Sequence, residues 1–220
     1  MVNYIFKNSN VEEIKIGKIV CLARTYKKHA EEMNSYIAKS PLLFLKPSTS
    51  VIFDRNSIII PPESNCIHHE VELGVVIGKK CKNINHRDAL EYILGYTLAL
   101  DITARDIQEE AKKNGWPWTI AKGFDTFTPL SDVVLKNNFS DPNNVEISLK
   151  VNGISKQKSN TKNMIYSVEK IIEFISKIMT LEKGDLILTG TPEGVGELIE
   201  GDFIEAKLNN LISLNINVKR

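Results

Sequence analysis

The chain has 220 residues, of which 42% are hydrophobic and 25% are charged, as in an ordinary globular protein. Its 28 Lys and Arg residues nearly balance its 27 Asp and Glu residues, so the formal net charge is +1. This balance argues against a general nucleic-acid surface or a polybasic membrane surface, because both need a clustered basic excess. No apolar run approaches the roughly 20 residues of a transmembrane helix. We therefore expect a protein whose partners include no nucleic acid and no membrane.

The first ten residues contain no basic region followed by an apolar one, so we do not expect a secreted or imported protein. We therefore expect a cytoplasmic protein. The three cysteines, Cys21, Cys66 and Cys81, are odd in number and have no Cys-x-x-Cys spacing. Such cysteines are typical of reduced thiols in a cytosol-like compartment rather than of a disulfide framework.

Short apolar runs bounded by turn residues predict strands through the first half of the chain. The runs lie at residues 18–22, 42–45 and 57–60, and a helix-permissive stretch occupies 26–33. Residues 70–78 are rich in β-branched side chains and end at a glycine, which predicts another strand. Residues 93–100 are strongly apolar, and we expect them to form a buried strand that runs directly into Asp101.

Two helices are predicted in the second half of the chain. Residues 106–113 are followed by Asn114-Gly115, a typical helix end. Residues 167–179 carry apolar side chains at helical spacing, and Ser167 is a suitable N-cap. This second segment is the clearest amphipathic helix of the chain.

The other segments of the second half predict strands. Residues 146–151 alternate in polarity and precede Asn152-Gly153, which is a strong hairpin signal. Residues 186–188 lead into a loop with three glycines at 189–196, and residues 203–218 predict a final pair of strands. The chain is therefore predicted to be α+β, with much β structure and few βαβ units.

Three carboxylates are placed where they can bind a metal. Glu70 and Glu72 are separated by one residue of a predicted strand, so both side chains point to the same face. Like charges repel in this arrangement, and a divalent cation between them converts the repulsion into binding. With Asp101 they offer three oxygen ligands for a hard ion, and open positions remain for substrate and water. The alternatives are a solvated strand face for the two glutamates and a turn residue at Asp101.

Two further groups of side chains are candidates for chemistry. On a helix, His29 and Glu32 are neighbours at i and i+3, so the carboxylate can orient the imidazole and raise its basicity. A solvated helix face is the alternative. Arg105 and Gln108 closely follow Asp101, and Lys122 lies between apolar residues beside Gly123, which favours partial burial near a site.

The loop at 189–196 matches neither a P-loop nor a dinucleotide-binding motif, because the required lysine and the strand–helix context are missing. Its glycines fit either a tight turn or a nest of backbone N–H groups that receives a substrate carboxylate.

Taken in order, five segments of the chain resemble the fumarylacetoacetate hydrolase family. They are Arg24-Thr25-Tyr26 with His29 and Glu32, and the stretches at residues 43–48, 68–74, 100–106 and 188–196. The resemblance runs from about Gly17 to the C-terminus. It is most specific to the small single-domain branch, which includes acylpyruvate hydrolases that are also described as oxaloacetate decarboxylases.

The resemblance implies a mixed β-roll with few helices and one catalytic domain over residues 1–220, whose N-terminal part, 1–50, carries a lid helix. It also implies a homodimer and a metal held by acidic side chains. By motif, the metal ligands are Glu70, Glu72 and Asp101, the catalytic residues are His29, Glu32 and Lys122, and the substrate-binding residues are Arg24, Arg105, Gln108 and Thr191. The chain departs from the family at Thr25, where relatives commonly have Asn.

The resemblance further implies that the substrate is a small 2-oxo or β-diketo acid bound with Mg²⁺, or with Mn²⁺ or Ca²⁺ in its place. Hydrolysis of an acylpyruvate to pyruvate and a carboxylic acid is the first expectation, together with decarboxylation of oxaloacetate. The alternatives within the family are oxaloacetate keto–enol tautomerisation, fumarylpyruvate hydrolysis and dienoate isomerisation. An alternative of another class is a metal-stabilised binding protein without catalytic activity.

Overall fold

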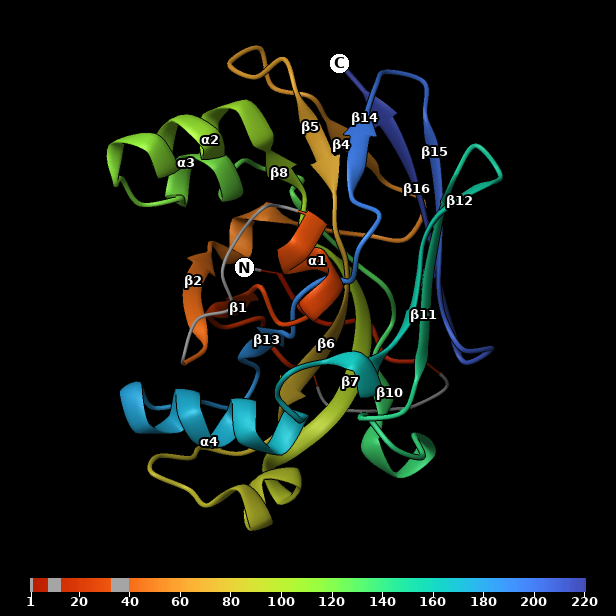
Figure 1. Cartoon of the computed structure of the whole chain (residues 1–220). Coiled ribbons are helices and arrows are strands. Elements are labelled where there is room, and N and C mark those ends of the chain that lie inside the picture. Colours follow the sequence, from red (N-terminus) through yellow and green to blue (C-terminus); the bar gives the residue numbers. More distant parts are fainter. Residues whose placement is uncertain (1, 8–12, 33–39) are drawn as a thin grey trace.

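The computed structural model describes residues 2–7, 13–32 and 40–220, and strands dominate it (Figure 1). The strands are β1 (Ile19–Ala23), β2 (Leu42–Lys46), β3 (Val51–Phe53), β4 (Ser57–Ile59), β5 (Ile67–His69), β6 (Val71–Ile77), β7 (Ile93–Leu100), β8 (Thr103–Ala104), β9 (Thr128–Leu130), β10 (Val134–Leu135), β11 (Glu146–Val151), β12 (Ile154–Asn160), β13 (Leu186–Leu188), β14 (Gly196–Leu198), β15 (Phe203–Leu208) and β16 (Ile212–Lys219). The α-helices are α1 (Lys27–Glu32), α2 (Arg105–Asn114), α3 (Thr119–Lys122) and α4 (Val168–Ile178), and short 3₁₀ helices lie at Ser48–Ser50, His86–Tyr92, Lys136–Asn138 and Thr161–Asn163.

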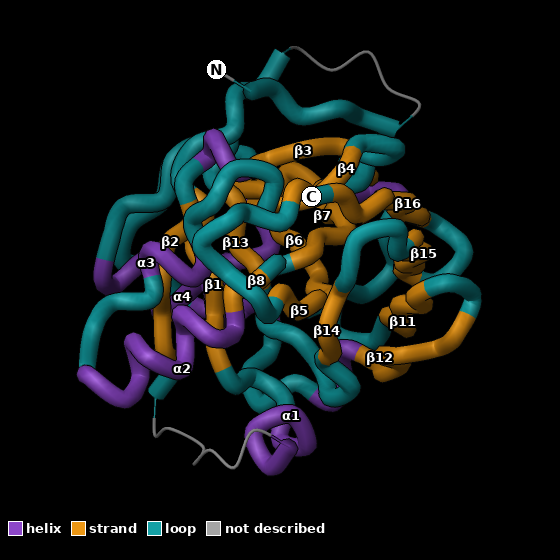
Figure 2. The backbone as a smooth tube through the Cα atoms, turned by 90° about the horizontal axis from the view of Figure 1, so that it is seen from above, coloured by secondary structure: helices purple, strands orange, loops and turns teal. Residues whose placement is uncertain are grey.

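The strands form three sheets. The largest is mixed and has the order β2-β1-β13-β6-β7-β9-β3, with β10 paired to β7. A second sheet has the order β12-β11-β15-β16-β4, and a third has the order β14-β5-β8. In Figures 1 and 2 the strands of the second sheet lie on the side of the molecule opposite α2 and α3. The expected α+β fold, a mixed β-roll with few helices, is confirmed.

Two chain segments, β5–β6 and β7–β8, each connect the small sheet with the large one. Strand β6 pairs with β7 in the large sheet, and β5 pairs with β8 in the small one. Glu70 lies between β5 and β6, and its carbonyl accepts the N–H of Asp101 at 2.8 Å. The predicted single strand over 70–78 is therefore wrong at its start, because the chain changes sheets at Glu70 and the strand of the large sheet begins at Val71.

Several predicted elements are confirmed, with boundaries within one residue of those predicted. Helix α4 has Ser167 as N-cap, and the hydroxyl oxygen of this residue accepts the N–H of Lys170. Helix α2 ends at Gly115, which has a φ of 70°. The hairpin of β11 and β12 turns at Asn152-Gly153, whose φ values of 52° and 78° suit a type I′ turn. Helix α1 begins one residue later than predicted, and the end of that prediction at residue 33 lies outside the described residues.

The core extends from the large sheet to α4 and to the inner face of β11, β15 and β16. Cys21 and Cys81 are buried, and all three cysteines are free thiols, as the sequence predicts. Within the described residues, no helix combines the length and the apolar character needed to cross a membrane.

The packing of α4 generates a prediction with an internal control. Ile172 is fully buried, whereas Ile178 on the same helix is 54% exposed. We expect Ile172→Ala to lower the free energy of unfolding by about 2–5 kcal/mol, because it leaves a cavity. Ile178→Ala should change it by no more than about 0.5 kcal/mol. Urea denaturation of both variants measures the difference, and equal effects would show that α4 does not pack on the core as described.

Candidate active site

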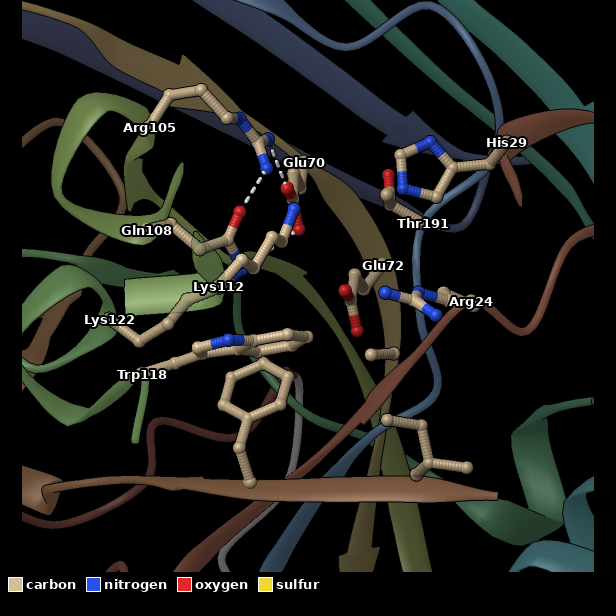
Figure 3. Close-up of a pocket in the computed structure, with 13 residues that line it drawn as sticks. Arg24, His29, Glu70, Glu72, Arg105, Gln108, Lys112, Trp118, Lys122 and Thr191 are labelled. Carbon is tan, nitrogen blue, oxygen red and sulfur yellow. Dashed lines mark hydrogen bonds and ion pairs between the residues drawn. The ribbon is translucent and has the colours of Figure 1, made fainter. Parts of the chain in front are cut away.

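A small cavity of about 40 Å³ opens where the large sheet meets the small one. It is lined by Leu22, Ala23, Arg24, His29, Phe44, Glu70, Glu72, Arg105, Gln108, Lys112, Trp118, Lys122 and Thr191. Figure 3 shows the side chains of α2 and α3 with Trp118 on one side of this cavity, and His29, Thr191 and Arg24 on the other. Glu70 and Glu72 lie between the two groups.

The three predicted metal-binding carboxylates converge at this cavity. One oxygen from each of Glu70, Glu72 and Asp101 lies within 4.8 Å of the other two. All three residues are buried. Their convergence follows from the strand register, because Glu70 and Asp101 sit side by side where the chain changes sheets. Oxygen donors at such spacing suit a hard divalent ion.

Buried cations partly compensate these carboxylates. The Lys122 ammonium forms ion pairs with Glu70 at 3.0 Å and with Asp101, and it donates to the Thr103 hydroxyl at 2.7 Å. Burial on its own lowers the pKa of Lys122, but the charges of Asp101 and Glu70 raise it above its ordinary value. Lys122 therefore stays protonated. Lys46 donates to the other oxygen of Asp101 at 2.7 Å.

Arg105 forms an ion pair with Glu70 and donates to the Gln108 side-chain oxygen at 2.6 Å. Its Nε–H also points at Nδ1 of His68, at 3.4 Å. Burial and the positive charge of Arg105 lower the pKa of His68 to about 4, so this imidazole is neutral near pH 7 and can accept. Arg105 is thus held by three partners, and its position at the cavity is fixed.

Glu70 and Glu72 have opposite pKa shifts. Burial raises the pKa of Glu70, but the charges of Lys122 and Arg105 outweigh burial and bring it below its ordinary range. Burial and the charges of Asp101 and Glu70 raise the pKa of Glu72 well above its ordinary value. The site is therefore short of positive charge at Glu72. A divalent ion among the three carboxylates would supply that charge, so the residues present fit a metal.

His29 and Glu32 lie together on α1, as predicted. Nδ1 of His29 is 3.2 Å from the Glu32 carboxylate, and His29 is 7% exposed. Glu32 also accepts the N–H of Gly194 at 3.0 Å. The carboxylate thus fixes the orientation of the imidazole, and a loop of the main body fixes the carboxylate. Nε2 is the ring nitrogen that remains to exchange a proton at the cavity.

The loop at 189–195 uses its backbone N–H groups on the protein's own carboxylates. Gly190 N–H donates to Glu72 at 2.6 Å, and Gly194 N–H donates to Glu32. The nest for a substrate carboxylate, one of the two predictions for this loop, is not what these two amides form. Gly190 has a φ of 94°, and a Cβ there would lie 2.0 Å from the Thr25 hydroxyl, which itself donates to the Thr189 carbonyl at 2.7 Å.

The structure gathers all ten predicted site residues around one place. Eight of them line the cavity. The other two are Asp101, which lies against Lys46 and Lys122, and Glu32, which holds His29. Their roles in binding and catalysis stay predictions.

Sequence reasoning missed four residues that complete the site. Lys46 is a fully buried cation inside a motif of the family resemblance, and a charged residue ending an apolar strand was a usable signal. Lys112 follows Gln108 by four residues and therefore shares its helix face. Trp118 packs on Phe44, with ring centroids 5.6 Å apart, and forms one wall. Gln157 comes from a distant strand, and no local pattern marks it.

A comparison with known families agrees with this geometry. Residues 18–219 match the family described as Fumarylacetoacetate (FAA) hydrolase C-terminal. The chain belongs to the fumarylacetoacetate hydrolase family. Among relatives in this family, oxaloacetate tautomerase FAHD1, mitochondrial, of Homo sapiens is 47% identical over 202 residues, which are 92% of this chain and 91% of the relative. The protein of the same name from Arabidopsis thaliana is 48% identical over 203 residues, with the same two coverages.

Solved structures of this family share the fold. The crystal structure of fumarylpyruvate hydrolase from Pseudomonas aeruginosa in complex with Mn²⁺ and pyruvate has a TM-score of 0.95 and 31% identity, and the match covers 99% of this chain and 95% of that one. The family, the fold and the ordered motifs therefore agree with the resemblance found in the sequence.

The charge distribution at Glu72 generates a prediction on metal binding. We expect Glu72→Gln to weaken Mn²⁺ binding by at least ~100-fold. Loss of a metal ligand should lower the affinity at least as much as loss of a residue that is hydrogen-bonded to a ligand. Stability of the metal-free protein should not fall, since the substitution removes repulsion from Asp101 and Glu70. Titration calorimetry and thermal unfolding measure the two effects. Glu197→Gln, at an exposed position on β14, is the control, and an equal Mn²⁺ affinity in both variants would rule out the site.

Proposed function

We propose that this protein is a divalent-metal-dependent enzyme that acts on a small 2-oxo acid, with keto–enol tautomerisation of oxaloacetate as its reaction. The observation that carries the proposal is the meeting of the buried acidic cluster and the His29–Glu32 pair at one cavity. The relatives named oxaloacetate tautomerase, at 47% and 48% identity, support proposing this reaction ahead of the acylpyruvate hydrolysis that the sequence favoured first.

Glu70, Glu72 and Asp101 would hold the ion. Their donor set consists only of oxygen, which suits Mg²⁺ or Mn²⁺, and Ca²⁺ among larger ions. When bound, the ion would act as a Lewis acid toward the 2-oxo group of the substrate. The Mn²⁺ in the fumarylpyruvate hydrolase structure supports a divalent ion. Mg²⁺ as the preferred ion is part of the proposal.

The chain's own groups would move the proton. Glu32 holds Nδ1 of His29, so Nε2 takes the proton from C3 of the keto form. A proton from this imidazolium then passes to the oxygen at C2 to complete the enol, and the reverse direction returns a proton to C3. As C3 loses its proton, negative charge develops on the oxygen at C2. The ammonium of Lys122, kept protonated by Asp101 and Glu70, stabilises that charge from a buried position.

Electrostatics of the cavity favour a substrate with two negative charges. The three carboxylates pair with the cations of Lys46, Lys122 and Arg105, and Lys112 and Arg24 line the same cavity, so a bound divalent ion leaves a surplus of positive charge. A dicarboxylate such as oxaloacetate offsets more of this surplus than a monocarboxylate does. This reasoning favours oxaloacetate over acylpyruvates that carry one carboxylate.

Lys112 is placed to receive the second carboxylate. Helix α2 directs Arg105, Gln108 and Lys112 to the cavity from one face. Lys112 lies over the ring of Trp118, 5.7 Å from its centroid, and within the described residues it pairs with no carboxylate. Partial desolvation and the nearby charge of Arg105 lower the pKa of Lys112, so an anion beside it would stabilise its ammonium form. We assign to Lys112 the carboxylate farther from the metal ligands.

Hydrolysis of an acylpyruvate is the second candidate. A histidine held by a carboxylate can also deprotonate a water that attacks the distal carbonyl, and carbon–carbon cleavage then releases pyruvate and a carboxylic acid. The fumarylpyruvate hydrolase structure with pyruvate supports this reading. Oxaloacetate decarboxylation would use the same stabilised negative charge without an attacking water. A protein without catalytic activity would gain nothing from the paired His29 and Glu32.

Other expectations from the resemblance belong to the same proposal. They are a homodimer, one catalytic domain over residues 1–220 with a lid helix within residues 1–50, and a cytoplasmic location. Arg24, Arg105, Gln108 and Thr191 are proposed as substrate-binding residues.

Substitution of the proposed base tests the reaction. We expect His29→Ala to lower kcat for oxaloacetate tautomerisation by about 10²–10⁴-fold while Mn²⁺ affinity changes little, because His29 is not a ligand. Ultraviolet absorbance of the enol form follows the reaction. His86→Ala, at a half-exposed histidine outside the cavity, is the matched control. Turnover of acetylpyruvate without turnover of oxaloacetate would replace tautomerisation by hydrolysis, and an unchanged kcat in His29→Ala would remove the base assignment.

Lys112 can be tested against its neighbour. We expect Lys112→Met to lower kcat/KM for oxaloacetate by about 10-fold or more, the size expected for a charged hydrogen bond. Acetylpyruvate, which has one carboxylate, should lose less than about 3-fold where it is turned over, since it has no group for Lys112 to bind. Lys113→Met, at an exposed lysine outside the cavity lining, should affect neither substrate. Equal losses with both substrates would refute the assignment.

A further inference from the structure

Gln157 is a fully buried polar residue of β12, in the second sheet, that reaches the segments carrying the site. Its side-chain oxygen accepts from Nδ1 of His69 at 3.0 Å and from the N–H of Val71 at 3.1 Å. Its side-chain nitrogen donates to the Thr191 hydroxyl oxygen at 2.8 Å and to the Pro192 carbonyl at 2.9 Å. One amide therefore uses all of its hydrogen-bonding capacity on two separate segments.

Two backbone groups fix which way this amide points. The N–H of Val71 can only donate, so the group facing it must be the oxygen of Gln157. The carbonyl of Pro192 can only accept, so the group facing it must be the nitrogen. A flipped amide would oppose donor to donor and acceptor to acceptor. The orientation thus follows from the backbone and leaves no alternative.

The direction of the Thr191 hydroxyl follows from this orientation. Because Oγ1 of Thr191 accepts from Gln157, its own hydrogen cannot point at Gln157 and must be donated elsewhere. Thr191 lines the cavity opposite α2 (Figure 3). We propose that Gln157 is a positioning residue that turns the Thr191 hydroxyl so that it donates its hydrogen to an anionic oxygen of the bound substrate. The role assigned to Thr191 rests on the proposed function, which supplies that anionic oxygen.

The same amide also sets the position of Glu70. His69 and Val71, which Gln157 binds, are the residues on either side of this carboxylate. Because Nδ1 of His69 must donate to the Gln157 oxygen, His69 carries a hydrogen on Nδ1. Gln157 therefore holds a metal-site carboxylate and a substrate-contacting hydroxyl in one fixed relation.

A double-mutant cycle tests the role of Gln157. Thr191→Val removes the donor and should lower kcat/KM by about 10–100-fold, as expected for a hydrogen bond to a charged group. Thr191→Ser keeps the hydroxyl and should stay within about 3-fold of the wild type. Gln157→Met should cause most of the Thr191→Val loss on its own, yet add less than about 3-fold in a Thr191→Val background, because the two residues act as one unit.

The binding of oxalate in the presence of Mn²⁺, measured by calorimetry, gives a readout that does not depend on the reaction. Oxalate carries adjacent carboxylate oxygens, and its affinity should show the same coupling. Lys158→Met, at an exposed neighbour on β12, is the control. Thermal unfolding and Mn²⁺ affinity report any structural damage in Gln157→Met.

The outcomes separate a positioning role from a structural one. If Gln157→Met lowers kcat/KM and oxalate affinity by the same factor in both Thr191 backgrounds, Gln157 only supports the fold and the proposal is wrong. If Gln157→Met does not fold, the comparison of Thr191→Val with Thr191→Ser tests the proposal. Wild-type activity in Thr191→Val would overturn it. Oxalate coupling without oxaloacetate turnover would reject the tautomerase and keep the role of Gln157. If the wild type neither binds oxalate nor turns over oxaloacetate, both the tautomerase assignment and the proposed role of Gln157 are wrong.

Discussion

The arrangement of this site follows from the burial of three carboxylates at the point where two strands change sheets. Glu70 and Asp101 meet there because the backbone of one pairs with that of the other. Burying like charges is costly unless each finds a partner. Lys122 and Lys46 supply partners from α3 and β2. The strand register brings the carboxylates together, and α3 and β2 must therefore pack where their lysines can pair with them.

Backbone amides connect this charged centre to the proposed base. Loop 189–195 leaves β13 and gives one N–H to Glu72 and another to Glu32. A shift of the loop would thus disturb a metal-site carboxylate and the His29–Glu32 pair together. Gly190 and Gly194 both have positive φ values, 94° and 92°, which glycine adopts without strain. The glycines that fit an anion-binding nest instead donate their N–H groups to two of the protein's own carboxylates, Glu72 and Glu32.

Local patterns in the sequence were sufficient for most helices, the hairpin and the acidic triad, because spacing within one element determines which side chains share a face. Strand β5 and the change of sheet at Glu70 were missed, since residues 68–70 are His-His-Glu and only pairing with a distant segment reveals the strand. Gln157 was missed for a related reason. Its partner His69 lies 88 residues away, and an isolated glutamine in an exposed-looking hairpin carries no periodic signal.

The nearly neutral composition conceals a site whose charge depends on what it binds. Carboxylates and cations lie side by side within it, so a bound divalent ion would add positive charge to the cavity and a bound dianion would offset that charge. Binding of the ion and of the substrate are then coupled, because each lowers the electrostatic cost of the other. Tautomerisation needs only a base at C3 and a stabilised oxygen, whereas hydrolysis also needs space for a water beside Nε2 of His29. The difference between the two reactions would then lie in whether a water fits beside Nε2 of His29, while the charged centre serves both.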